Sequence, residues 1–321
     1  MLSKLRTGGW FDSSNLGVVA VILETVIVPI FLVIIAGYVF QKLTSMETAT
    51  LSHVVLHILT PCLVFTSIVT ASSVGSEWLK ICALVVATTF TLILLSWIIA
   101  KSFRLSKDMT TAFVLSTSFV NAGNYGLPLS LFAFGEKGLA FAVIFFVVSI
   151  LLIFTVGVLV ASGGRCGFKQ GLKSVIRLPL IYAICAGVVV RLTSANLPEP
   201  VMRAANLMSQ AAIPVMLVLL GMELACSGID WSLSPRMGLV ALSSGIKLLF
   251  PMLFVGIVAE LIGLVGIAGN VTILQASMPT AVFATLLALK FGGDSRFVTN
   301  TVVFSTLISI VTLTFLLSIL I

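Results

Sequence analysis

Residues 121–128 combine two asparagines, two glycines and a proline inside an otherwise apolar stretch. Pro128 has no N–H and clashes with the carbonyl four residues before it, so we expect the helix to kink or break near Asn124. Hydrocarbon offers no partners to the backbone groups that a break frees, so such breaks persist only inside protein or beside a water-filled cavity. The amides of Asn121 and Asn124, with the freed backbone N–H groups, are neutral donors that would suit an anion. The alternative is a packing kink whose asparagines bond neighbouring helices.

Residues 274–280 repeat this arrangement with fewer polar groups. Gln275 lies four residues before Pro279, which is the spacing seen in the first segment. Gln275 would either contribute to the same anion site or form a helix–helix hydrogen bond. The residues predicted to bind a substrate are Asn121, Gly123, Asn124, Lys247, Gln275, Ser277 and Thr280, and those predicted to break the helices are Gly126, Pro128 and Pro279.

The composition shows in which solvent these residues act. Of 321 residues, 59% belong to the hydrophobic set and only 9% are charged, whereas soluble domains carry about 25% charged residues. The 18 Lys and Arg with 11 Asp and Glu cannot cover the surface of a soluble fold of this length. A soluble enzyme, a secreted disulfide scaffold and a disordered chain are therefore excluded, and we predict an all-α polytopic membrane protein.

A helix needs about 20 apolar residues to cross a membrane. Ten transmembrane helices are predicted, at residues 16–41, 48–71, 78–101, 109–134, 138–162, 174–193, 203–226, 236–261, 266–290 and 298–320.

Four markers recur at nearly one offset along the chain, which indicates an internal repeat. They pair Pro29 with Pro179, Ala36-Gly37 with Ala186-Gly187, Pro61 with Pro214 and Pro128 with Pro279, at offsets of 150, 150, 153 and 151 residues. We therefore divide the chain into two five-helix repeats, residues 1–162 and 174–321. Because five is odd, the second repeat must enter the membrane from the opposite side, as in the inverted repeats of many secondary transporters. The broken helices 4 and 9 would then cross near the midplane.

The distribution of the cations predicts the orientation. Loops on the side of the central connection carry 11 Lys and Arg, loops on the other side carry 6, and Lys247 lies inside a span. Basic residues gather on the cytoplasmic side of membrane proteins. We expect a multi-pass protein of the plasma membrane, or of the inner membrane in a bacterium, with both termini extracellular or periplasmic.

Two charged residues lie well inside the predicted spans. An ionised side chain at the centre of a membrane costs about 2.5–3.5 kcal/mol on insertion scales. Lys247 would attract an anion, pair with Glu24, or extend its ammonium toward the membrane surface. Glu223 and Glu260 lie near the ends of their spans, and we expect them at the interface with water.

The sequence predicts neither a metal site nor a cofactor. His53 and His57 are four residues apart, but no third ligand clusters with them, so a packed or interfacial pair is the favoured interpretation. No phosphate-binding loop is present, so direct use of ATP is not expected. Nucleic acid is not an expected partner either, because the basic residues belong to membrane-flanking loops.

The segments described above resemble the auxin efflux carrier family, which includes the plant PIN exporters and bacterial carriers assigned to malonate-like acids. The resemblance rests on residues 121–129 (NAGNYGLPL), 134–136 (FGE), 274–279 (LQASMP) and 291–294 (FGGD). It covers essentially the whole chain and implies a fold similar to the bile-acid/sodium symporters. In that fold, spans 1, 2, 6 and 7 form a scaffold domain, while spans 3–5 and 8–10 form a transport domain in which the broken helices cross.

The resemblance also implies an organic anion as substrate. Many members carry an asparagine about four residues after the span-9 proline, where this chain has Phe283. This departure removes one amide and leaves the size and polarity of the substrate open.

We therefore predict a secondary transporter, not an enzyme, that moves a small organic anion across the membrane by alternating access. The substrate would be an auxin-like or malonate-like carboxylate, the direction would be export, and the surrounding partner is membrane lipid. Coupling to a proton or sodium ion and assembly as a homodimer are left open by the sequence. The alternative is a sensor or scaffold that binds an organic anion without transporting it.

Overall fold

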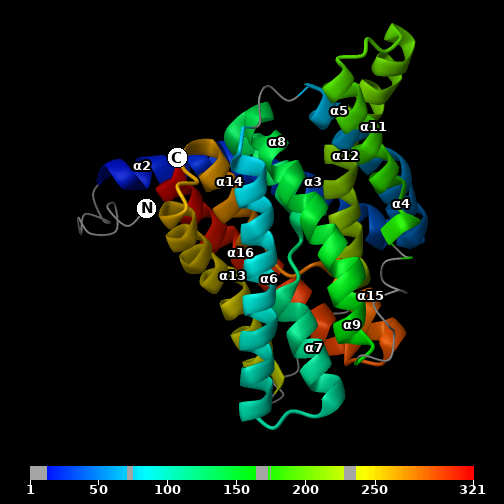
Figure 1. Ribbon diagram of the computed structural model, residues 1–321. Coiled ribbons are helices and arrows are strands. Elements are labelled where there is room, and N and C mark those ends of the chain that lie inside the picture. Colours follow the sequence, from blue (N-terminus) through cyan, green and yellow to red (C-terminus); the bar gives the residue numbers. More distant parts are fainter. Residues whose placement is uncertain (1–12, 71–74, 164–172, 174, 228–235) are drawn as a thin grey trace.

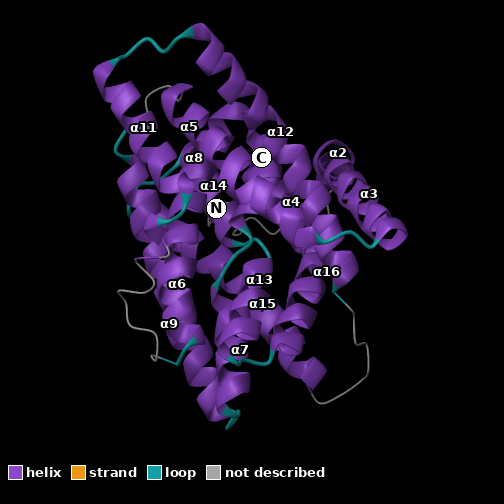
Figure 2. Ribbon diagram, turned by 90° about the vertical axis from the view of Figure 1, so that its right-hand side faces the viewer, coloured by secondary structure: helices purple, strands orange, loops and turns teal. Residues whose placement is uncertain are grey.

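Every named element of the computed structural model is a helix (Figures 1 and 2). An isolated antiparallel bridge between Val120 and Thr280 is the one strand-like pairing among the described residues. The structure describes residues 13–70, 75–163, 173, 175–227 and 236–321. The predicted loop cations that lie outside these residues are Lys4, Arg6, Arg165 and Lys169.

The helices follow the apolar stretches of the sequence, and π-helical turns, labelled η, interrupt several of them. The first half contains α2 (Ser13–Ile22), η1 (Leu23–Ile27), α3 (Val28–Thr44), α4 (Thr48–Val54), η2 (Val55–Leu59), α5 (Thr60–Thr70), α6 (Glu77–Ser102), α7 (Lys107–Ser118), η3 (Ala122–Gly126), α8 (Leu127–Leu152), η4 (Ile153–Gly157) and α9 (Val158–Ala161). The second half contains α11 (Pro179–Thr193), α12 (Glu199–Cys226), α13 (Arg236–Leu261), α14 (Gly266–Ala276), α15 (Val282–Phe291) and α16 (Ser295–Leu320).

Within the described residues, seven helical stretches are long and apolar enough to cross a membrane, whereas the sequence predicts ten. They are Gly17–Thr44, Thr48–Thr70, Glu77–Ser102, Ala122–Ala161, Glu199–Cys226, Arg236–Leu261 and Ser295–Leu320. The difference has a physical basis. The predicted spans 109–134 and 266–290 are interrupted, α11 has only 15 residues, and residues 122–161 form one helical run.

Gly135 divides the long α8 into two parts. Its φ of 64° and ψ of −163° are not helical angles, and glycine reaches a positive φ without the steric cost that a Cβ imposes. The residue lies between the predicted spans 109–134 and 138–162, so the chain changes direction at the position where the sequence separates them.

Side-chain caps fix the starts of two helices that follow short loops. The Ser106 hydroxyl accepts a hydrogen bond from the Met109 N–H at 3.3 Å, at the start of α7. The Asp294 carboxylate accepts one from the Phe297 N–H at 3.0 Å, at the start of α16. Such caps satisfy backbone donors that have no partner inside the helix.

The helices pack as two groups. One contains α3, α5, α11 and α12, and the other contains α6, α7, α8, α13, α14, α15 and α16. In Figure 1 the first group occupies the upper right, while α6, α13 and α16 lie nearer the middle of the picture. Contacts of α12 with η3 and α8 join the groups, so the break between α7 and α8 faces the boundary between them.

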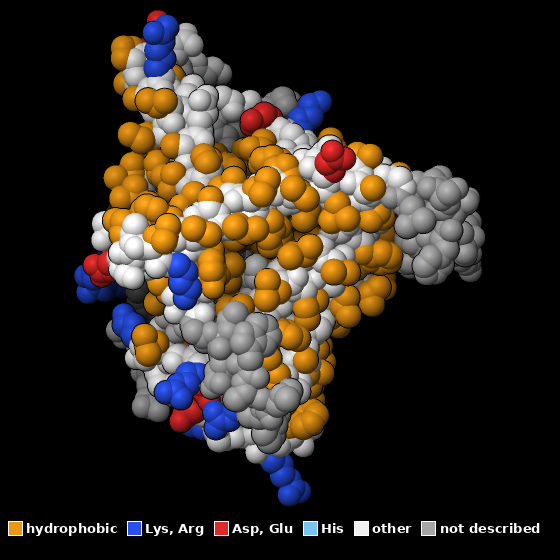
Figure 3. All heavy atoms as spheres, turned by 180° about the vertical axis from the view of Figure 1, so that it is seen from behind, with side chains coloured by type: hydrophobic (Ala, Val, Ile, Leu, Met, Phe, Trp, Pro, Cys, Tyr) orange, Lys and Arg blue, Asp and Glu red, His pale blue; other side chains and the backbone are white. Residues whose placement is uncertain are grey.

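The outer surface is largely apolar. Hydrophobic side chains form a broad band across the middle of the face seen in Figure 3, and many charged side chains lie toward its upper and lower ends. Large exposed side chains include Leu32, Phe90, Leu253 and Val311. A soluble protein would not expose so much apolar surface, and a lipid environment explains it. The chain is a multi-pass membrane protein.

Candidate functional site

The two helix breaks lie side by side and are joined by main-chain hydrogen bonds. The Asn121 N–H donates to the Pro279 carbonyl at 2.8 Å, and the Ala281 N–H donates to the Phe119 carbonyl at 3.0 Å. These bonds form the bridge between Val120 and Thr280. Two extended segments thus satisfy each other's backbone groups at a depth where hydrocarbon offers no partner.

The first break lies earlier in the chain than the sequence predicts. We expected it near Asn124, but α7 ends at Ser118 and the helical turn η3 begins again at Ala122. Pro128 is the second residue of α8, which continues directly from η3, so it lies inside the second half-helix and not at the break. Its missing N–H follows the π-helical turn η3, and the non-helical segment ends before that turn.

Hydroxyl groups surround the paired breaks on the side of α13 and α16. The Thr280 hydroxyl donates to the Ser116 carbonyl at 2.8 Å, and the Thr280 N–H donates to Ser305 Oγ at 3.2 Å. Ser243 Oγ lies 2.8 Å from Thr117 Oγ1 and 3.1 Å from Ser116 Oγ. These bonds explain why a serine- and threonine-rich pattern borders both breaks, since freed backbone groups need partners inside the protein.

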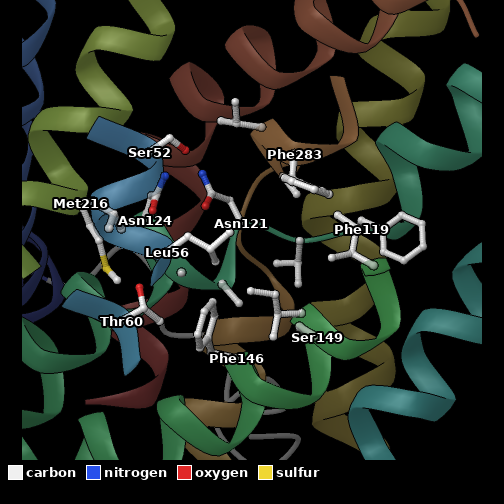
Figure 4. Close-up of a pocket in the computed structure, with 18 of the residues that line it drawn as sticks. Ser52, Leu56, Thr60, Phe119, Asn121, Asn124, Phe146, Ser149, Met216 and Phe283 are labelled. Atoms are coloured by element: carbon white, nitrogen blue, oxygen red, sulfur yellow. The ribbon is translucent and has the colours of Figure 1, made fainter. Parts of the chain in front are cut away.

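A cavity of about 150 Å³ opens beside the first break. Figure 4 shows the amides of Asn121 and Asn124 extending side by side into it. Its polar lining residues include Ser52, Thr60, Asn121, Asn124, Ser149 and Glu223, and its apolar lining residues include Leu56, Phe146, Ile150, Phe154, Met216 and Phe283. Phe154 and Phe283 form a tilted aromatic pair with ring centroids 4.6 Å apart. The cavity therefore offers polar groups on one side and an aromatic wall on the other.

Three polar atoms of this cavity are buried without a hydrogen-bond partner in the described residues. They are Asn121 Nδ2, Ser149 Oγ and Glu223 Oε2. Asn121 is only 6% exposed, so bulk water does not readily reach its amide. The Asn124 side chain is hydrogen-bonded to Glu223. Unpaired buried polar atoms are costly, and in a cavity they indicate where a ligand would bind.

Four predicted binding residues lie away from this cavity. Gln275 is fully buried, and its Nε2 donates to Ser130 Oγ at 3.2 Å. The Ser277 hydroxyl donates to the Ile273 carbonyl at 2.8 Å, and Thr280 makes the bonds described above. These side chains hold the second break to its neighbours. Among the predicted binding residues, the structure brings Asn121, Gly123 and Asn124 to the cavity.

Lys247 is the fourth residue outside the cavity. It is 1% exposed, and its Nζ donates to the Ala276 carbonyl at 3.0 Å, at the C-terminal end of α14. Glu24 is exposed and forms no ion pair with it. Pairing with Glu24 is therefore wrong, and so is extension of the ammonium to the surface. The negative end of the α14 dipole is the group that faces this cation.

Gly126 permits close contact between the two broken helices. A Cβ at this position would overlap the carboxamide of Gln275. We expect Gly126→Ala to destabilise the protein by about 1–3 kcal/mol, because Gln275 must move and release Ser130. Thermal unfolding in detergent measures this loss.

The double variant Gly126→Ala/Gln275→Ala is the matched test of this contact. Removing the carboxamide leaves room for the new Cβ and eliminates the unpaired Gln275 Oε1, so most of the lost stability should return. A double variant that is no more stable than Gly126→Ala would contradict this packing.

The sequence analysis missed Glu223 as a cavity residue. It predicts an interfacial position from the nearness of Glu223 to the end of a span. The helix α12 extends to Cys226, however, and Glu223 lies on the same face as Met216 and Leu219, which also line the cavity. The spacing of three and four residues is the signal that could have revealed it. Ser149 was missed because a lone serine in an apolar span carries no such signal.

A second cavity lies on the other halves of the same helices. It has a volume of about 630 Å³ and is lined by residues including Leu63, Thr66, Lys137, Gln210 and Ile213. Met216 lies one turn after Ile213 on α12, and Thr60 lies one turn before Leu63 on α5. Met216 and Thr60 line the first cavity, whereas Ile213 and Leu63 line the second. The two cavities thus lie next to each other along α5 and α12.

The protein combines membrane-spanning helices with a cavity at paired helix breaks, which is the arrangement expected of a membrane transport protein. Comparison with known families agrees with this class. A family model described as membrane transport protein matches residues 21–170 and 167–317. The chain belongs to this family, which confirms its membership of the auxin efflux carriers. It is a transport protein and not an enzyme.

Two archaeal proteins are similar over nearly their whole length. One is named an uncharacterized transporter of Methanothermobacter thermautotrophicus; it is 28% identical over 297 residues, which are 90% of this chain and 95% of that protein. The other is named uncharacterized transporter MJ1031 of Methanocaldococcus jannaschii; it is 23% identical over 299 residues, 89% of this chain and 94% of that protein.

Proposed function

We propose that this protein is a secondary carrier that moves a small organic acid across the membrane by alternating access. The observation that carries the proposal is the buried Asn121 Nδ2, an unpartnered donor in the cavity beside the paired breaks. A carboxylate oxygen is the acceptor that such a donor requires. The neighbouring amide of Asn124 and the aromatic wall suit an acid with a compact apolar body.

Ten spans in two inverted repeats are part of the proposal. Equivalent glycines support it: Gly37 packs against the Val218 backbone, and Gly187 packs against Ile68. The first contact joins spans 1 and 7, and the second joins spans 6 and 2. This exchange of partners is what a pseudo-twofold axis would generate.

We further propose that the two helix groups act as the scaffold and the transport domain. The group of α3, α5, α11 and α12 corresponds to spans 1, 2, 6 and 7, and the remaining helices correspond to spans 3–5 and 8–10. The candidate cavity is lined from both groups. Sliding of one group past the other would close one cavity and open the other, which is alternating access of the elevator type.

The proposed orientation places both termini outside the cell and the central connection in the cytoplasm, since 11 cations lie on that side and 6 on the other. Export is the proposed direction for an anion that crosses alone. An inside-negative potential favours its efflux by about 2.3 kcal/mol per 100 mV.

Reconstitution in liposomes tests the proposal. We would measure uptake of labelled indole-3-acetate, phenylacetate, benzoate, malonate and succinate under a potential, a proton gradient or a sodium gradient imposed separately. Protein-free liposomes supply the background leak of each acid. Saturable flux of at least one acid is expected. Saturable binding without flux would support a sensor instead, and the absence of both would overturn the proposed substrate class.

Phe283 should set the preference among these acids. Phe283→Asn removes half of the aromatic pair with Phe154 and adds an amide. The ratio of malonate flux to phenylacetate flux should therefore rise about tenfold, which corresponds to one hydrogen bond to a charged group. The measured quantity is the ratio of the two fluxes.

Phe250→Asn is the matched control for this prediction. Phe250 stacks on Phe254 with ring centroids 5.5 Å apart, and neither residue lines the cavity. Its replacement should leave the flux ratio unchanged. An equal change of the ratio in both variants would contradict a specificity role for Phe283.

A further inference from the structure

Glu223 is the one ionisable side chain among the described residues that line the candidate cavity. It lies in the last turn of α12, and its carboxyl group is hydrogen-bonded to Asn124 at the first break. Its Oε2 is buried and has no partner in the described part of the chain. A carboxyl group of the protein therefore faces the space in which the proposed substrate would place its own.

Two ionised carboxylates would repel each other strongly at this site. Repulsion between like charges increases as water is excluded, and carboxyl groups that share one site do not both ionise. Carrying one proton between them removes the repulsion. The proton then forms a hydrogen bond from one carboxyl oxygen to the other.

The unpartnered atoms of the cavity match this arrangement. Asn121 Nδ2 can donate to one oxygen of the substrate, and Glu223 Oε2 can share a proton with the other. Asn124 holds the opposite side of the Glu223 carboxyl group. A monocarboxylic acid with one proton thus satisfies a buried donor and a buried acceptor that otherwise stay unpaired.

We propose that Glu223 and the substrate carboxylate share one proton, so that the carrier moves an organic monoanion together with one proton. This inference rests on the proposed function and adds its coupling ion. The proton comes from water on the side of entry and returns to water on the side of release. The loaded carrier then has the same single negative charge at this site as the empty carrier with ionised Glu223, so each cycle moves no net charge. With the proton coupled, the proton gradient replaces the membrane potential as the force that sets the direction of transport.

Other titratable groups near α12 do not face Glu223. The elements packed against α12 carry Tyr38, Lys42, His53, His57, Cys62, Tyr125, Glu136 and Lys137. None of them lines the candidate cavity. The side chains on α3, α4 and η2 are exposed, Tyr125 is bonded to Ser309, and Glu136 and Lys137 line the second cavity.

Proton uptake on binding is the first test. Calorimetric titration of the purified protein with phenylacetate, in two buffers of different ionisation enthalpy, counts the protons taken up. At a pH where free Glu223 is ionised, the wild type should take up about one proton per bound acid, and its Kd should weaken about tenfold with each further pH unit. Binding with no proton uptake from about pH 5 to about pH 10 would overturn the inference, and this measurement needs no variant.

Glu223→Gln and Glu260→Gln form a matched pair of variants. Glutamine keeps a hydrogen bond to Asn124 but does not titrate, so Glu223→Gln should bind the acid without proton uptake and with a Kd that is independent of pH. Glu260 also lies in the last turn of a long helix, α13, but it is exposed and outside both cavities. Glu260→Gln should behave as the wild type, and a pH dependence retained by Glu223→Gln would contradict the assignment.

Flux in liposomes separates this inference from the proposed function. Wild-type liposomes containing a pH-sensitive dye should acidify inside in step with uptake of phenylacetate, above the leak of protein-free liposomes, and an inward proton gradient should raise the uptake. Glu223→Gln should lose this dependence. Acid flux without proton movement would overturn the inference and leave the proposed function intact, whereas no flux of any acid in the panel would overturn the proposed function itself.

Discussion

Replacement of Asn124 by alanine is expected to lower the flux of the transported acid by about 10- to 100-fold without loss of the fold. Asn124 lies at the first break, lines the candidate cavity and bonds the Glu223 carboxyl group. A hydrogen bond to a charged group contributes about 1.5–3 kcal/mol, which corresponds to this range of rates. The initial rate of labelled acid uptake, divided by the amount of folded protein in the liposomes, is the quantity to measure.

Asn300→Ala provides the control for this prediction. Asn300 is a half-buried asparagine on α16 that lines neither cavity, so its replacement should leave the flux within a factor of about two. Thermal unfolding and gel filtration establish that both variants are folded. Wild-type flux in Asn124→Ala would contradict the assignment of the cavity as the substrate site.

Lys247→Glu is expected to destabilise the protein by about 3–5 kcal/mol, a large part of the roughly 5–15 kcal/mol that stabilises a typical protein. The Lys247 ammonium is buried and faces the carbonyl end of α14. A carboxylate there would lose the bond to Ala276 and meet the negative end of the helix dipole. The yield of monodisperse protein and its unfolding temperature are the measurements.

Lys247→Met separates the effect of charge reversal from the effect of losing the lysine. Methionine fills a similar volume and removes the cost of a buried charge, while one hydrogen bond is lost, so the net change should stay within about 2 kcal/mol. Equal destabilisation by methionine and glutamate would show that the ammonium itself, and not the sign of the local field, holds the second break.

The sequence predicts the fold class and the broken segments because both depend on local chemistry. Apolar stretches of sufficient length specify helices in lipid, and prolines with glycines interrupt them. The exact position of the first break depends on tertiary contacts instead. Phe119 becomes extended and Asn121 leaves the helical conformation because they pair with Ala281 and Pro279. A pairing across about 160 residues is not visible in either segment alone.

The candidate site was predicted only in its local part. Asn121, Gly123 and Asn124 share one segment, and the structure brings them to one cavity. Gln275 and Thr280 have similar polarity, but their side chains turn toward Ser130 and Ser116. Whether a buried amide faces a cavity or a neighbouring helix depends on rotation about the helix axis. Composition and spacing do not determine that rotation.

The main-chain pairing of the two breaks has an evolutionary consequence. The N–H of residue 121 and the N–H of residue 281 supply the bonds, and every amino acid except proline offers that donor. The junction therefore keeps its geometry whatever side chains stand there, and Asn121 is constrained by its amide in the cavity rather than by the pairing. Side chains beside it, such as Phe283, are then free to vary under selection for a different cargo. Relatives that share only 23% or 28% of their residues with this chain can keep one junction and still diverge in what they carry.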